Sequence, residues 1–197
     1  LFLVPKSAGG VTTRDYPTLD ETRASEVYLE NVSVAAEHVL GEVDSALPVI
    51  ERIVDDANAA YCSEAVGAMR MMTALTQEYA KGRKQFGRPI ADFQVLQHRM
   101  VDMFMASEES YSMALLATIK LDAADDERAR AVSSAKVSIG KASRFVGQAA
   151  VQIHGGMGMT DEMRVGHYFK RTTMLDSTFG NVDFHLKRFA GLSAKAA

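Results

Sequence analysis

QAAVQIHGGMGMT, residues 148–160, contains the end of a helical pattern and the glycines that stop it. Gly155 follows the last helical residue, His154, and glycine at this position adopts left-handed backbone angles without a Cβ clash. Three glycines within residues 155–158 exceed what a helix end requires, and they expose backbone N–H groups that a bulky anion can approach. Taken alone, this pattern is most often a plain corner between two helices.

The segments on both sides of this corner have helical periodicity, which predicts a mainly α protein. Apolar residues recur at steps of three to five over residues 46–79, which predicts a helix of roughly 50 Å. Asp92 is the expected N-cap of a second helix. Asp161 and Glu162 suit the first turn of another. Further helices are expected around residues 132–149, 161–175 and 181–192. Long helices with short connections favour an antiparallel bundle.

Residues 1–45 differ from the rest of the chain. The segments 1–4 and 27–34 are rich in strand-forming residues, and glycine and proline punctuate the stretch between them. A lone pair of strands is marginal in water, so these strands are expected to be the remnant of a larger β-domain. We therefore expect two parts: residues 1–45 as a β remnant with a linker, and residues 46–197 as the helical bundle. The start at Leu1, inside an apolar run, suggests a fragment.

Composition excludes several classes of function. The net charge of −3 argues against nucleic-acid binding, which normally needs a basic face. The apolar run at residues 1–4 is too short for a membrane span. One cysteine, Cys62, excludes an internal disulfide and fits a reducing cytoplasm, and its helical context predicts a buried residue. HxxxH, CxxC and HExxH spacings are absent, so no metal site is predicted, and His154 is interpreted as a cap or packing residue.

A second informative stretch is GRKQFGRPI, residues 82–90, between two helical patterns. It can be a solvated basic loop. It can also bind phosphate, because the guanidinium of Arg83 has the fork geometry that phosphate oxygens require. Phe86 in the same loop offers an apolar wall or a stacking face.

Together, RKQFGRPI and QIHGGMGMTDE, with the spacing between them, resemble the C-terminal helical domain of the acyl-CoA dehydrogenase family. The resemblance extends over nearly the whole chain and implies that residues 1–45 are the tail of that family's middle β-domain. It also implies FAD, held at a subunit interface, an acyl-CoA substrate, an electron acceptor and a same-family subunit in a homo- or hetero-oligomer. The positions that match the family's flavin contacts are Arg83, Gln85, Phe86, Gln94, Gln152, Gly155 and Gly156.

The chain departs from the family at the catalytic base. Family members remove the α-proton of the thioester with a glutamate, usually in a Tyr-Glu-Gly-Thr context, while flavin accepts the β-hydride. The matching stretch here is residues 178–181, TFGN, and the glutamate position is Phe179. Some relatives place the base on the first long helix, where the matching position is Ala57, flanked by Asp55 and Asp56. The expected carboxylate is therefore absent from both places.

Three interpretations of this absence remain open. The chain can be one subunit of a hetero-oligomer in which another subunit supplies the base; residues 167–189 resemble the small subunit of such pairs, including those acting on dicarboxylic or steroid side-chain thioesters. It can be a non-catalytic homomer. It can use a displaced base, Asp176 or Asp183, or a carboxylate of the first helix. A rival from another class is a helical assembly module without flavin, in which Arg83 and Gln152 would lie scattered over the surface.

Overall fold

The computed structural model of the chain describes residues 1–194, and this part of the protein is mainly helical, as predicted. Two compact units divide the chain, Leu1–Ile53 and Val54–Ala197. The division falls inside the first helix, a few residues beyond the expected boundary at residue 45. Within residues 1–194, no helix combines the length and the hydropathy that crossing a bilayer requires.

The N-terminal unit contains one antiparallel strand pair, β1 (Val11–Pro17) and β2 (Arg23–Leu29), followed by a short 3-10 helix, η1 (Ala36–His38). The strand expected at residues 1–4 was wrong: it makes only an isolated bridge, between Phe2 and Val39. β2 shares only its last residues with the second expected strand. The pairing follows instead from the turn at residues 18–22, where the Oγ1 atoms of Thr18 and Thr22 donate to the carboxylate of Asp20.

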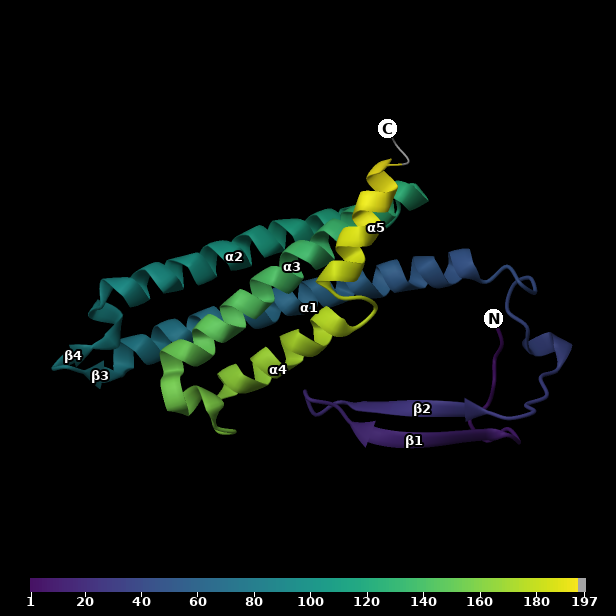
Figure 1. Cartoon of the computed structure of the whole chain (residues 1–197), viewed down its shortest axis with the longest axis horizontal. Helices are drawn as coiled ribbons and strands as arrows, with labels where there is room; N and C mark the ends of the chain where they lie inside the picture. Colours follow the sequence, from purple (N-terminus) through teal and green to yellow (C-terminus); the bar gives the residue numbers. More distant parts are fainter. Residues whose placement is uncertain (195–197) are drawn as a thin grey trace. The chain divides into compact units, whose positions relative to one another are not determined.

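The C-terminal unit is an antiparallel bundle in which α3 packs against α2, α4 and α5 (Figure 1). Its elements are α1 (Leu47–Gly82) from Val54 onward, β3 (Lys84–Gln85), β4 (Arg88–Pro89), η2 (Ile90–Asp92), α2 (Gln94–Ile119), α3 (Asp125–His154), η3 (Gly155–Met159), α4 (Arg164–Ser177) and α5 (Val182–Ala194).

Two expected helix starts are displaced. Asp92 is not an N-cap, because it lies in η2; Phe93 holds that position and makes no side-chain cap. Asp161 and Glu162 precede α4, because the glycines of residues 155–159 first form the 3-10 turn η3. The 3-10 turns η2 and η3 therefore precede α2 and α4, at positions where the sequence predicted that the helices themselves would begin.

Small residues on α3 allow α4 to approach closely. A Cβ on Gly147 would overlap the ring of Phe169, and a Cβ on Gly140 would overlap the carboxylate of Asp176. Residues 140 and 147 of α3 therefore lie opposite residues 176 and 169 of α4, and both pairs of positions are seven residues apart. Because interiors are close-packed, these glycines set the distance between the two helices.

Gly147→Ala should destabilise the protein by about 1–3 kcal/mol, because the added methyl group overpacks the contact with Phe169. Gly67→Ala is the matched control: Gly67 is exposed in the interior of α1, with open space at its Cβ position. Alanine there should be neutral or stabilise by about 0.5–1 kcal/mol, through helix propensity alone. Urea unfolding followed by circular dichroism measures both. Equal unfolding midpoints for the two variants would contradict the packing argument.

Candidate functional site

The two sequence motifs lie at the same end of the bundle (Figure 1). Tyr79, in the last turns of α1, donates its hydroxyl hydrogen bond to the carbonyl of His154 at 3.3 Å, and the two rings stack with centroids 4.3 Å apart. The same Tyr79 accepts, through its carbonyl, the backbone N–H of Arg83 at 2.8 Å. One aromatic contact therefore joins the start of the basic segment to the residue before Gly155.

His154 is a packing residue in this arrangement. Its side chain is buried, and Nδ1 lies 2.8 Å from the carbonyl of Ala150. Within residues 1–194, no group of three His, Cys, Asp or Glu side chains could hold a metal ion.

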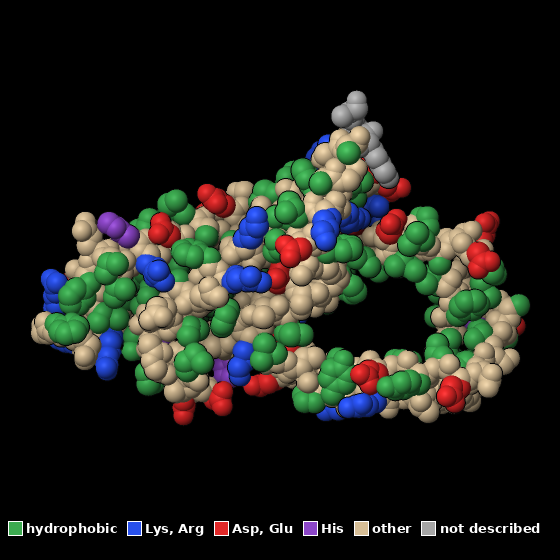
Figure 2. All heavy atoms as spheres, in the orientation of Figure 1, with side chains coloured by type: hydrophobic (Ala, Val, Ile, Leu, Met, Phe, Trp, Pro, Cys, Tyr) green, Lys and Arg blue, Asp and Glu red, His purple; other side chains and the backbone are tan. Residues whose placement is uncertain are grey.

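The basic segment forms a tight β-hairpin rather than an irregular loop. β3 pairs with β4 through a two-residue turn in which Phe86 and Gly87 both have positive φ, 55° and 80°. Such turns match the twist of paired strands. Phe86 lies at the tip of this turn, where 91% of its surface is exposed to solvent. Lys and Arg side chains are exposed at this end of the bundle, as they are along the rest of the visible face (Figure 2).

Phe93 supports the hairpin from the start of α2. The guanidinium of Arg88 lies 4.2 Å from the centroid of the Phe93 ring, and Phe86 makes an edge contact with the same ring at 6.0 Å. Gln94 follows directly as the first residue of α2 and is exposed. Arg83 and Gln85 are exposed as well.

The diglycine corner offers open backbone. Gly155 ends α3 with φ of 60°, and its N–H is bonded to the carbonyl of Gln152. A Cβ at Gly155 or Gly156 would meet nothing within 4 Å, whereas at Gly158 it would overlap the carbonyl of Val151. Gly158 therefore serves packing, and Gly155 and Gly156 leave backbone that a ligand can approach. Gln152 is exposed beside them.

Phe179, at the expected base position, lies in the loop between α4 and α5. Its backbone is left-handed, with φ of 53°, and its ring stacks on Tyr61 with centroids 5.9 Å apart. The Phe179 carbonyl accepts hydrogen bonds from Nε2 of His185 at 3.1 Å and from Nδ2 of Asn58 at 3.5 Å. The residue is 47% exposed, so its side chain does not belong to the core.

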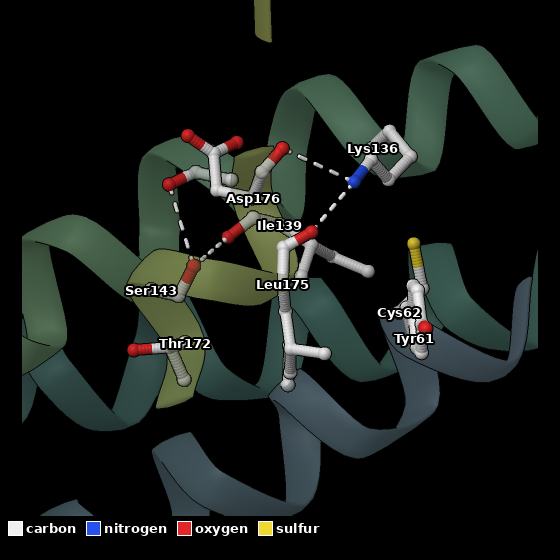
Figure 3. Close-up of a pocket in the computed structure, with 10 residues that line it drawn as sticks. Tyr61, Cys62, Lys136, Ile139, Ser143, Thr172, Leu175 and Asp176 are labelled. Carbon is white, nitrogen blue, oxygen red and sulfur yellow. Dashed lines mark hydrogen bonds between the residues drawn. The ribbon is translucent and has the colours of Figure 1, made fainter. Parts of the chain in front are cut away.

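Lys136, a buried residue of α3, binds the end of α4. Its Nζ donates to the carbonyls of Leu175 at 2.8 Å and Asp176 at 3.3 Å (Figure 3), and to the carbonyl of Thr178 at 3.0 Å. Desolvation lowers the pKa of Lys136, and Cys62 and Asp176 oppose that shift. A cation at a helix C-terminus satisfies carbonyls that lack helical partners. No local pattern predicts this role, because the three carbonyls are about 40 residues away.

The cavity beside Lys136 is too small for a substrate. Its volume is about 10 Å³, close to the room that one water molecule needs (Figure 3). Cys62 lines it, and burial raises the pKa of that thiol to about 12, so the sulfur stays protonated.

Two of the carboxylates considered as displaced bases, Asp55 and Asp176, pair with arginines. Asp55 is fully buried and accepts hydrogen bonds from Arg188, at 2.6 and 3.1 Å, and from Arg128, at 3.2 Å. Asp176 faces α3, where its Oδ2 lies 3.8 Å from Arg144. Asp183 is exposed in the first turn of α5.

Asp55→Ala should destabilise the protein by about 3–5 kcal/mol, because it removes the carboxylate that pairs with Arg188 and leaves the buried Arg128 with only the exposed Asp125. The control is Glu64→Ala, which removes a bidentate but partly exposed pair with Arg171 and should cost no more than about 1 kcal/mol. Chemical denaturation measures both. A small loss for Asp55→Ala would show that the pair does not hold α1, α3 and α5 together.

Stability should also depend on His185 at acid pH. Burial lowers the pKa of His185 from 6.5 to about 4, helped by the charges of Lys136 and Arg188, while the hydrogen bond to Phe179 opposes the shift. Between these values the unfolded chain binds the proton more tightly than the folded one. The contribution of neutral His185 is therefore complete above pH 6.5 and is lost as the pH falls through 4. In urea titrations, His185→Gln should lack this component; parallel profiles for both proteins would contradict it.

Comparisons with known proteins identify the family to which the chain belongs. The family model described as acyl-CoA dehydrogenase, C-terminal domain, matches residues 47–190. Acyl-CoA dehydrogenase IpdE2 of Mycolicibacterium smegmatis is 34% identical over 160 residues, which cover 81% of this chain and 46% of that protein. The mitochondrial very long-chain specific acyl-CoA dehydrogenase of Mus musculus is 29% identical over 164 residues, 82% of this chain and 25% of that protein.

A solved structure has the same fold. A variant of the Tcur3481-Tcur3483 steroid ACAD superposes with a TM-score of 0.88 and 27% identity, covering 100% of this chain and 52% of that one. The chain thus spans from a quarter to about half of the length of these relatives. With the family model matching most of its length, the chain belongs to the acyl-CoA dehydrogenase family and contains that family's C-terminal helical domain.

Proposed function

We propose that this chain is part of an FAD-dependent acyl-CoA dehydrogenase that introduces an α,β double bond into an acyl-CoA thioester. Its own contribution is a set of flavin contacts and an oligomer interface. Bound FAD would supply the acceptor for the β-hydride, and the α-proton must pass to a carboxylate. An electron acceptor then has to reoxidise the flavin.

The residues at the hairpin end fit a dinucleotide. Arg83 offers a guanidinium for pyrophosphate oxygens, and Gln85 and Gln152 offer amides. Gly155 and Gly156 leave room for close approach of a phosphate or ribose to the backbone. Phe86, exposed at the hairpin tip, offers a face for a planar ring, and Gln94 adds a further amide. These groups turn outward, which suits a flavin bound mainly by a neighbouring subunit.

One observation carries this proposal: the contact between Tyr79 and His154, which brings two segments about seventy residues apart to one end of the bundle. A helical assembly module without flavin is the alternative. It would not require these polar groups to share an end, and no feature of the described residues favours it.

A second subunit of the same family is proposed to supply the base. Phe179 cannot accept a proton, and the carboxylates of Asp55 and Asp176 each pair with an arginine, Arg188 and Arg144. Asp183 lies in the first turn of the next helix, and a displacement of even about 1 Å impairs proton transfer. A hetero-oligomer is therefore preferred over a displaced base and over a homomer without catalytic activity.

Flavin titration of the full-length protein tests the proposal. Arg83→Ala should weaken FAD binding about 10- to 100-fold, because it removes a charge-assisted hydrogen-bonding group. Gln152→Ala should weaken it less, because a neutral amide is lost. Binding is measured by the change in flavin absorbance and fluorescence.

Arg70→Ala is the control, since Arg70 is a similarly exposed arginine in the middle of α1 that contacts Glu108 and Tyr111. It should bind FAD like the wild type. A full-length protein that is colourless and takes up no FAD, alone or with its second subunit, would favour the assembly module instead.

A further inference from the structure

The backbone of Phe179 is held in a conformation that its residue type disfavours. A non-glycine residue with φ near 53° is uncommon, and an aromatic side chain has no local polar group to compensate for the strain. Such strain persists only where the surroundings impose it. The surroundings of the loop 178–180 are therefore informative.

Three side chains from three helices bind the carbonyls of this loop and the turn before it. Lys136 of α3 binds the carbonyl of Thr178, and Asn58 of α1 and His185 of α5 both bind the carbonyl of Phe179. All three donors are fully or almost fully buried. Every one of these hydrogen bonds ends on a main-chain oxygen, and none involves the phenyl ring.

His185 is itself fixed by a further layer. Its Nδ1 lies 3.3 Å from Oγ of Ser133, which accepts a hydrogen bond from Arg188 at 3.4 Å. Arg188 binds both oxygens of the fully buried Asp55. The chain of contacts thus runs from a buried ion pair to the carbonyl of Phe179.

These observations separate the backbone of the loop from the side chain at position 179. The three donors bind only main-chain carbonyls. The hydrogen bonds that hold the loop therefore do not depend on which side chain occupies position 179. The side chain leaves the loop toward a half-exposed space beside Tyr61, so a polar group there would not be buried. At this position, this chain therefore differs from a family member that carries the catalytic base by a single side chain.

We propose that the loop 178–180 is an intact support for a catalytic base whose place is taken by a phenyl ring, and that Phe179→Glu gives this chain the ability to remove the α-proton of an acyl-CoA thioester. This inference rests on the proposed function. Lys136, Asn58 and His185 are positioning residues in this scheme, since they act through the backbone.

The step to be measured needs no oxidant. The introduced carboxylate takes the α-proton, the C–H electron pair delocalises into the thioester carbonyl as an enolate, and a deuteron from heavy water returns to the same carbon. The net change is exchange of hydrogen for deuterium, with the acyl-CoA otherwise unaltered. It is therefore a readout independent of flavin reduction.

The experiment uses the full-length chain purified without a second subunit, so that no other subunit contributes a carboxylate. Butyryl-, octanoyl- and palmitoyl-CoA are first ranked by calorimetry, and the tightest binder is incubated in heavy water with and without FAD. Mass spectrometry then measures deuterium at the α-carbon. Phe179→Glu should exchange at least about 100-fold faster than the wild type, the lower range for a positioned general base. Phe179→Gln, with the same shape and no basic oxygen, should remain at the wild-type rate.

Lys136→Met in the Phe179→Glu background tests the positioning role. It should lose most of the gained exchange while acyl-CoA affinity stays within about threefold. Amide hydrogen exchange at residues 178–181 of the Lys136→Met single variant should accelerate about tenfold or more, whereas Lys141→Met, at an exposed position of the same helix, should leave it unchanged. This second readout needs neither ligand nor the Phe179 variants.

The outcomes distinguish the two levels of the argument. If acyl-CoA binds but Phe179→Glu exchanges no faster than Phe179→Gln, the intact support is refuted and the proposed function stands. Unchanged amide exchange in Lys136→Met likewise refutes the clamp. If none of the three thioesters binds to the chain alone, this inference is refuted, and the flavin titration still decides the proposed function.

Discussion

The close approach of α4 to α3 is the constraint on which the rest of the helical unit depends. Glycine at positions 140 and 147 lets Asp176 and Phe169 pack directly on the α3 backbone. With α4 at this distance, the ammonium of Lys136 reaches the last carbonyls of α4, and the loop to α5 begins beside α1. Wider spacing would leave a buried ammonium without acceptors, which is far more costly than a lost methyl contact. Packing and polar contacts therefore specify the same arrangement.

Buried polar groups specify geometry here more than they add net stability. Desolvation offsets much of the attraction between Asp55 and its two arginines, but a misplaced helix would strand a charge in the core. Asp55, Arg128 and Arg188 come from three helices, α1, α3 and α5, so their contact fixes all three at the end that carries the loop 178–180. The opposite end is fixed by an aromatic contact, Tyr79 on His154, which joins α1 to α3 beside the exposed hairpin and glycines. The two ends thus have different chemistry. The hairpin end exposes cationic side chains and glycine backbone to solvent, whereas at the other end buried side chains bind the carbonyls of the loop 178–180.

The helices could be predicted from sequence because their signal is local: a repeated apolar step is sufficient to identify α1, α2 and α3. The hairpin of residues 84–89 was missed because a left-handed Phe86 is unusual in a two-residue turn, where asparagine, aspartate or glycine is expected. The strand at residues 1–4 failed for the reverse reason, since strand-forming residues need a partner in register, and only Phe2 finds one. Motif spacing placed the candidate flavin residues in two segments, but their common end follows from Tyr79, which no motif contains. The roles of Lys136 and Asp55 depend on partners 40 and 133 residues away, so no local pattern encodes them.

The seating of Phe169 on Gly147 has an evolutionary consequence. Neither residue can change size alone: a side chain at 147 collides with the ring, and a small residue at 169 leaves a void against α3. Descendants of this chain can therefore exchange bulk between the two helices only by paired, compensating substitutions. Covariation of positions 147 and 169 would be the trace that this contact leaves in related sequences.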